Sequence, residues 1–175
     1  MTVYRGNIDA IYPNSPEAQL RKSTGQSTDA PFLSPARIFE LPESPDFLSA
    51  GDFDADGHWD LAAGALGSTR LYLLRGDGHG GFAAPESVSL AGAITAMIGG
   101  EAGRPDGLID LVLALRSAHG AQLAIFQGPE GALCTKPEAI PLPAEANELA
   151  LGRFYGGPFI DLAAALGSRL VLVRG

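Results

Sequence analysis

Residues 51–61 read GDFDADGHWDL, and this stretch decides how we interpret the fold. Four carboxylates stand at positions 1, 3, 5 and 9 of a loop that starts at residue 52: Asp52, Asp54, Asp56 and Asp60. Gly57 at position 6 permits a sharp turn, so the oxygens can point to one place, where they repel unless a cation lies among them. Oxygen ligands favour a hard ion such as Ca²⁺, with His58 at a position that a backbone carbonyl usually fills. The alternative is a solvated acidic turn without an ion.

The last aspartate of this loop begins a pattern that returns twice. Three Asp-Leu pairs stand 50 and 51 residues apart: Asp60-Leu61, Asp110-Leu111 and Asp161-Leu162. An apolar run follows each pair, and a second apolar run then ends at a glycine, which is Gly76, Gly128 or Gly175. These runs are too short for independent helices, so they predict the strands of a sheet.

Each repeat unit is expected to hold four strands. In the first unit we expect them at about 47–50, 61–66, 71–75 and 82–90, with the acidic loop between the first two. The units span about 45–92, 93–143 and 144–175. Four-stranded antiparallel sheets repeated at this period are typical of propeller blades. We therefore predict an all-β fold, a β-propeller or propeller arc with about three blade units per chain.

The ends of the chain do not fall on unit boundaries. Residues 3–6 look like the end of a third strand and residues 35–41 like a fourth strand, with an exposed polar insertion at 7–34 between them. The third unit stops after its third strand, and we treat residues 1–175 as one domain. Propellers typically close with 4–8 blades. Three units therefore predict either self-association, in which a dimer closes a six-bladed ring, or a part of a longer propeller.

Composition narrows the classes of partner. Hydrophobic residues make up 46% of the chain and charged residues 18%, as in a globular protein, and the net charge is −8. No cluster of Lys and Arg is present, which argues against nucleic acid as a partner. Cys134 is the single cysteine, so no internal disulfide or thiolate metal site is possible. No run approaches the ~18 apolar residues that span a bilayer, so we expect no membrane insertion.

Residues 51–65, followed by a strand and the turn GDGHGGF at 76–82, resemble the FG-GAP/VCBS repeats of integrin-α-like β-propellers. The resemblance covers most of the chain outside the insertion, although Phe47-Leu48 replaces the family's Phe-Gly and Gly64-Ala65-Leu66 its Gly-Ala-Pro. It implies that the loop between the first two strands binds Ca²⁺ through the side chains of Asp52, Asp54, Asp56 and Asp60 and the backbone carbonyl of His58. It also suggests an extracellular or periplasmic location, although residues 1–6 lack the apolar core of a signal peptide.

The remaining loops separate this interpretation from its competitors. An EF-hand requires a bidentate Glu at position 12 of the loop, where this chain has Ala63. The second unit keeps Glu101, Asp106 and Asp110, which leaves a second ion site open, whereas the third keeps only Asp161. Asp110 and Asp161 persist although neither of their loops keeps the full set of carboxylates. We therefore predict that the aspartate of each Asp-Leu pair caps the turn through backbone N–H groups, and that Asp60 does so too.

The sequence favours a non-enzymatic function. Our leading hypothesis is a calcium-stabilised scaffold that presents loops to a protein or glycan ligand or assembles with itself. A propeller-type lyase or hydrolase is the alternative, and it would need charged residues on several first strands. The expected first strands at 47–50, 94–97 and 149–151 carry none. A purely structural oligomerisation repeat is a third possibility.

Overall fold

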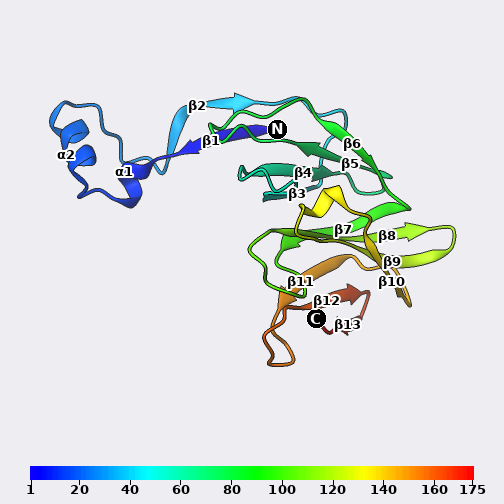
Figure 1. The fold of residues 1–175 in the computed structure, drawn as a ribbon. Coiled ribbons are helices and arrows are strands. Elements are labelled where there is room, and N and C mark those ends of the chain that lie inside the picture. Colours follow the sequence, from blue (N-terminus) through cyan, green and yellow to red (C-terminus); the bar gives the residue numbers. More distant parts are fainter. The chain divides into compact units, whose positions relative to one another are not determined.

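The structure, a computed structural model, describes residues 1–175 and consists mainly of antiparallel strands (Figure 1). Four open sheets of two to four strands confirm the predicted all-β class and its antiparallel pairing. The chain divides into two compact units, Met1–Leu41 and Pro42–Gly175. We describe each unit by itself.

The first unit is a two-stranded sheet with a helical insertion. Strands β1 (Thr2–Gly6) and β2 (Phe32–Ile38) pair antiparallel, and Gly6 lies opposite Phe32. Between them the chain forms two short helices, α1 (Ile8–Ile11) and α2 (Pro16–Ser23), where the sequence indicated only an exposed polar excursion.

Local caps explain why this polar segment becomes helical. The Ser15 hydroxyl accepts a hydrogen bond from the Ala18 amide at 3.2 Å, and Pro16 takes the first helical position. Arg21 of α2 donates to the carboxylate of Asp9 at 2.7 Å, which joins the two helices and lowers the pKa of Asp9. The buried Asn7 amide donates to the carbonyls of Thr28 and Ala30, so the ends of the insertion are also held.

The second unit consists of three sheets in which every strand pairs with its neighbour in sequence. The first sheet holds β3 (Phe47–Gly51), β4 (Asp60–Gly64), β5 (Arg70–Leu74) and β6 (Glu86–Ser89). The second holds β7 (Ala93–Gly100), β8 (Asp110–Ser117), β9 (Gly120–Phe126) and β10 (Glu138–Leu142), with the 3-10 helix η1 (Ala132–Cys134) before β10. The third has three strands, β11 (Glu148–Gly152), β12 (Asp161–Leu166) and β13 (Arg169–Val173).

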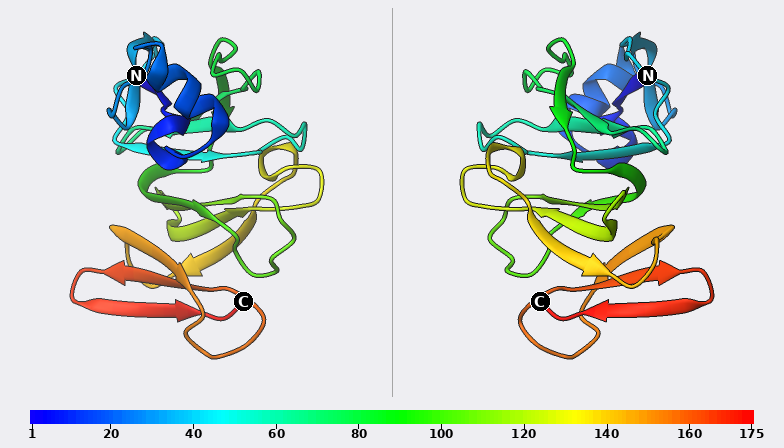
Figure 2. Two further views of the ribbon diagram at one scale, coloured as in Figure 1. Left: turned by 90° about the vertical axis from the view of Figure 1, so that its left-hand side faces the viewer. Right: turned by 90° about the vertical axis from the view of Figure 1, so that its right-hand side faces the viewer.

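Two apolar cores join these sheets face to face. Leu71 and Leu73 of the first sheet pack with Leu111 and Leu113 of the second. On the opposite face of the second sheet, Val112 packs in a core with Leu162 and Ala164 of the third. Strand β8 is therefore buried on both faces, which agrees with its nearly continuous apolar sequence. Figure 2 shows the second and third sheets (green to yellow, and orange to red) stacked in this way.

The first strands of successive sheets lie beside one another, β3 next to β7 and β7 next to β11. Glycine permits this close approach. A Cβ atom at Gly99 of β7 would overlap the Ser49 side chain of β3, and one at Gly100 would come within 2.8 Å of Leu151 in β11. A side chain at Gly99 would displace Ser49, and one at Gly100 would require the end of the Leu151 side chain to move.

Candidate metal centre

Three carboxylates converge in the acidic loop that connects β3 to β4. One oxygen each from Asp52, Asp54 and Asp60 lies within 4.8 Å of the others. Two oxygens bound to the same Ca²⁺ at its usual distance of about 2.4 Å lie at most ~5 Å apart. The spacing and the all-oxygen chemistry therefore fit one hard cation, and Asp52, Asp54 and Asp60 are the residues that would hold it.

Asp56 and His58 have other contacts. The Asp56 carboxylate accepts a hydrogen bond from the His58 amide at 2.8 Å and lies outside the group of three. The His58 imidazole is about half exposed, with its Nδ1 3.6 Å from the same carboxylate. Of the four aspartates that the sequence selected, the structure brings three together.

Backbone hydrogen bonds turn the loop around Asp52. Its two carboxylate oxygens accept from the amides of Asp56 at 3.1 Å and Gly57 at 2.9 Å. Ala55 and Gly57 have positive φ angles of 60° and 86°. Asp52 therefore stabilises the turn whether or not an ion is bound.

Asp60 fastens the loop to the next turn of the sheet. Its side chain is fully buried, and its two oxygens accept from the amides of Phe53 at 3.0 Å and Gly76 at 2.8 Å. Burial raises the pKa of Asp60, while these two hydrogen bonds oppose the rise. Gly76 must lack a side chain, because a Cβ atom there would overlap the carbonyl oxygen of Trp59. The predicted turn-capping role of this aspartate is confirmed.

Arg75 adds a positive charge that sequence reasoning missed. Its guanidinium is paired with the Asp54 carboxylate and also donates to Glu86 at 3.2 Å. The Asp54 side chain is almost fully buried, with 5% exposed. An Arg-Gly pair also occurs at Arg5-Gly6 and Arg174-Gly175, but this dipeptide does not indicate which carboxylate the arginine contacts.

The corresponding loop of the second sheet keeps the turn and loses the cluster. Glu101 accepts from the amides of Asp106 at 2.9 Å and Gly107 at 3.0 Å, as Asp52 does in the first loop. Its longer side chain compensates for the one extra residue that it must span. Glu101, Asp106 and Asp110 do not gather their oxygens as Asp52, Asp54 and Asp60 do. The geometry therefore gives no support to a second ion site here.

Asp110 occupies the place of Asp60 but has one hydrogen bond instead of two. One oxygen accepts from the Ala102 amide at 2.8 Å. Burial raises the pKa of Asp110 to about 6, and the nearby charges of Asp106 and Glu101 add to the rise.

Asp161 of the third sheet has the most complete cap of the three. One oxygen accepts from the amides of Phe154 at 2.8 Å and Tyr155 at 3.0 Å, and the other from Gly175 at 3.1 Å. The hydrogen bonds from Tyr155 and Gly175 lower the pKa of Asp161, and the charge of Arg174 contributes to the same effect. The Arg174 guanidinium lies 5.9 Å from the centre of the Tyr155 ring, so an arginine–aromatic contact replaces the Arg75–Asp54 pair.

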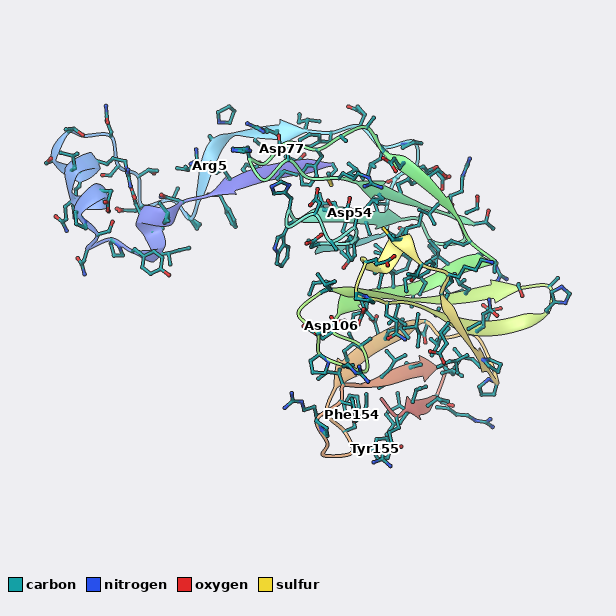
Figure 3. The ribbon with its side chains drawn as sticks, in the orientation of Figure 1. Arg5, Asp54, Asp77, Asp106, Phe154 and Tyr155 are labelled. Atoms are coloured by element: carbon teal, nitrogen blue, oxygen red, sulfur yellow. The ribbon has the colours of Figure 1, made fainter.

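Figure 3 shows that the three loops lie at the same end of their sheets, with Asp54, Asp106 and Phe154 as markers. Comparison of the chain with protein-family models, curated proteins and solved structures gave no match. Neither helix of the chain has the length or apolar character needed to cross a membrane.

Proposed function

We propose that this chain is a calcium-stabilised, non-enzymatic module of the β-propeller type, in which stacked sheets present their loops to a protein or glycan ligand. The observation that carries the proposal is the convergence of Asp52, Asp54 and Asp60 within 4.8 Å in the loop between the first two strands. The resemblance of this loop to FG-GAP/VCBS repeats names Ca²⁺ as the ion and the propeller as the architecture.

The packing of the sheets supports this architecture. The second sheet shares one core with the first and another with the third, and the first strands of successive sheets are neighbours. Blades of a propeller pack in this manner around an axis. At millimolar ion and a dissociation constant ~10-fold lower, Ca²⁺ would add on the order of 1 kcal/mol by mass action. Such an ion stabilises the loop and does not act as a switch.

We also propose that two copies associate through the third sheet. Leu170 and Leu172 of β13 are 74% and 44% exposed, whereas Leu71 and Leu73, at the same places in β5, are 0% and 3% exposed. Strand β13 is also an edge of its sheet. An apolar face beside an open edge favours coverage by a further sheet. Native mass spectrometry tests this, since a stable monomer at micromolar concentration would contradict it.

The calcium proposal is tested by calorimetric titration with Ca²⁺ of the wild type and of Asp54→Asn. We expect one ion per chain in the wild type, and at least ~10-fold weaker binding in the variant, because one of three carboxylate ligands is lost. Asp106→Asn is the matched control from the sister loop and should bind as the wild type does. A wild type that binds no Ca²⁺ would contradict the proposal.

Asp56→Asn adds a separate arm to the same titration. Weaker binding in this variant would mean that Asp56 turns from the His58 amide to the ion, as the family resemblance implies. Unchanged binding would restrict the carboxylate ligands to Asp52, Asp54 and Asp60.

A further inference from the structure

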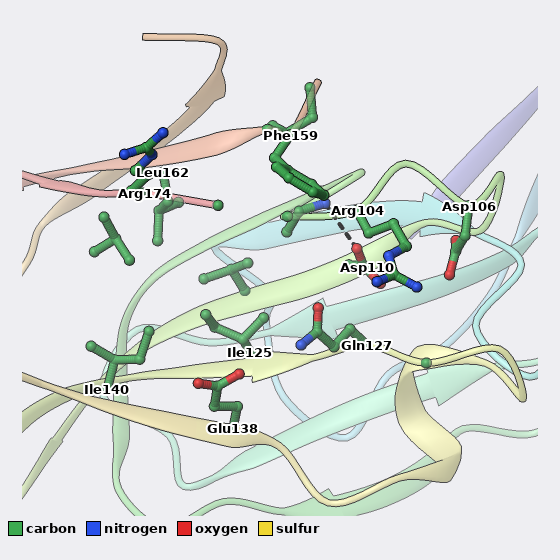
Figure 4. A pocket seen from close by; sticks show the side chains of 17 residues that line it. Arg104, Asp106, Asp110, Ile125, Gln127, Glu138, Ile140, Phe159, Leu162 and Arg174 are labelled. Atoms are coloured by element: carbon green, nitrogen blue, oxygen red, sulfur yellow. Dashed lines mark hydrogen bonds between the residues drawn. The ribbon is translucent and has the colours of Figure 1, made fainter. Parts of the chain in front are cut away.

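A cavity of about 530 Å³ opens between the second and third sheets (Figure 4). Its size is typical of small-molecule sites. Much of its wall is apolar and comes from both sheets: Val112, Ile125, Ile140, Leu162 and Val173. Charged and polar side chains complete the lining: Arg104, Asp106, Asp110, Gln127, Glu138 and Arg174.

Asp110 gives this cavity a buried carboxylate with a free oxygen. The residue is 3% exposed, and its Oδ2 is held by the Ala102 amide. Its Oδ1 accepts no hydrogen bond from the protein, whereas the Oδ1 atoms of Asp60 and Asp161 accept from the amides of Gly76 and Gly175. Every fully buried side-chain oxygen in the structure has a hydrogen-bond partner. Because Oδ1 of Asp110 has none, it is not fully buried, and it is reachable from the cavity that Asp110 lines.

The first sheet shows which group belongs beside Glu138, another residue that lines the cavity. Glu86 and Glu138 each begin the fourth strand of a sheet, where they lie opposite Leu73 and Ile125. Two residues after those partners stand Arg75 in the first sheet and Gln127 in the second. Arg75 lies between Glu86 and Asp54.

In the second sheet the same arrangement lacks its cation. Gln127 stands where the first sheet has Arg75. Gly103 follows Ala102, whose amide caps Asp110, just as Asp54 follows Phe53, whose amide caps Asp60. Glu138 lines the cavity and has no cationic partner. The cavity therefore has a carboxylate at the place where the first sheet binds a guanidinium on an aliphatic stem.

We propose that this cavity binds a small molecule that carries one guanidinium or ammonium group on a short aliphatic chain. The cation pairs with Asp110 and Glu138, and the chain lies on the apolar wall. A charged donor on a buried carboxylate forms a strong hydrogen bond. Arg104 and Arg174 also line the cavity, and their charges disfavour a second cationic group, so a monocation is preferred to a diamine. This inference does not depend on calcium binding.

The test is a calorimetric titration with n-butylguanidinium in the presence of EDTA, which removes any contribution of a metal. We expect saturable binding, and at least ~10-fold weaker binding of the neutral analogue n-butylurea, because the analogue forms no charge-assisted hydrogen bond. Equal affinity for the two probes would overturn the proposal and mean apolar binding only. Tighter binding of the capped tripeptide acetyl-Gly-Arg-Gly-amide than of n-butylguanidinium would also overturn the small-molecule assignment.

Variants locate the binding. Glu138→Gln should weaken n-butylguanidinium at least ~10-fold, whereas Glu148→Gln, an exposed carboxylate on β11 that does not line the cavity, should leave it unchanged. Gln127→Arg places the first sheet's guanidinium beside Glu138 and should abolish binding. The one hydrogen bond of Gln127 to another side chain uses its backbone carbonyl and is kept in this variant, so the variant should fold as the wild type does. Undiminished binding to folded Gln127→Arg would refute the assigned site.

Discussion

Asp110 and Asp161 occupy the same place in neighbouring sheets, at the start of the second strand, and both are 3% exposed. Asp161 accepts three backbone hydrogen bonds, and its pKa is lowered. Asp110 accepts one, and its pKa is raised to about 6. The two pKa values move in opposite directions because burial is the largest influence on Asp110, which one N–H donor does not offset, whereas the backbone donors outweigh burial at Asp161. An aspartate with a full set of donors stabilises the fold, and one with a free oxygen is available to a ligand.

The largest effect is expected from replacing Asp60, the most deeply buried of the three capping aspartates, and it tests whether the number of accepted hydrogen bonds sets the contribution to stability. In EDTA, Asp60→Ala should lower the free energy of unfolding by about 4 kcal/mol, since it leaves the amides of Phe53 and Gly76 without their acceptor at ~1–3 kcal/mol each. Urea denaturation measures the loss. Asp110→Ala, which frees one amide, should cost about half as much. Equal losses would show that the number of hydrogen bonds does not set the contribution.

The pH dependence of stability should separate Asp110 from Asp161. The pKa of Asp110 is about 6 in the folded state and 3.8 in its ordinary state, so the folded protein binds its proton more tightly. Stability should fall as pH rises from about 4 to 6, by about 2 kcal/mol, and level off above. Asp110→Asn should reduce the fall by this amount, as followed by urea denaturation across the range, and any fall that remains reports Asp60, whose pKa is also raised. A wild-type curve that is flat between these values would contradict the assignment.

The contribution of Asp161 to stability should change with pH in the opposite direction. Its pKa is lowered in the folded state, so its contribution to stability is present above its ordinary pKa of 3.8 and is lost as pH falls through the folded value. Asp161→Asn should reduce this acid-side loss and leave the region between pH 4 and 6 unchanged.

The smallest effect is expected at Arg75. Its side chain is 43% exposed, so Arg75→Gln should cost less than about 1 kcal/mol in EDTA despite the loss of two ion pairs. Because the guanidinium and a metal ion compete for Asp54, the variant should bind Ca²⁺ more tightly than the wild type in a calorimetric titration. Weaker binding in the variant would mean that Arg75 supports the site and does not compete for it.

Local patterns in the sequence predicted the strands and the capping aspartates. The Asp-Leu pairs and the glycine-bounded apolar runs depend on neighbours in the chain, so β4, β8 and β12 begin where the repeat indicated. Helices α1 and α2 were missed because they are short and rest on caps within a polar segment. The Arg75–Asp54 pair depends on residues brought together by strand register, and the cavity depends on how two sheets pack. Neither leaves a signal within one stretch of sequence.

The hydrogen bonds that Asp60 accepts make the opening of the acidic loop observable by amide exchange. The amide protons of Phe53 and Gly76 are held by a side chain and not by the strand ladder. Their exchange with deuterium therefore reports the rate at which the carboxylate releases the loop, separately from the opening of β4 and β5. These two amide protons therefore measure how often the loop that carries the candidate metal centre opens.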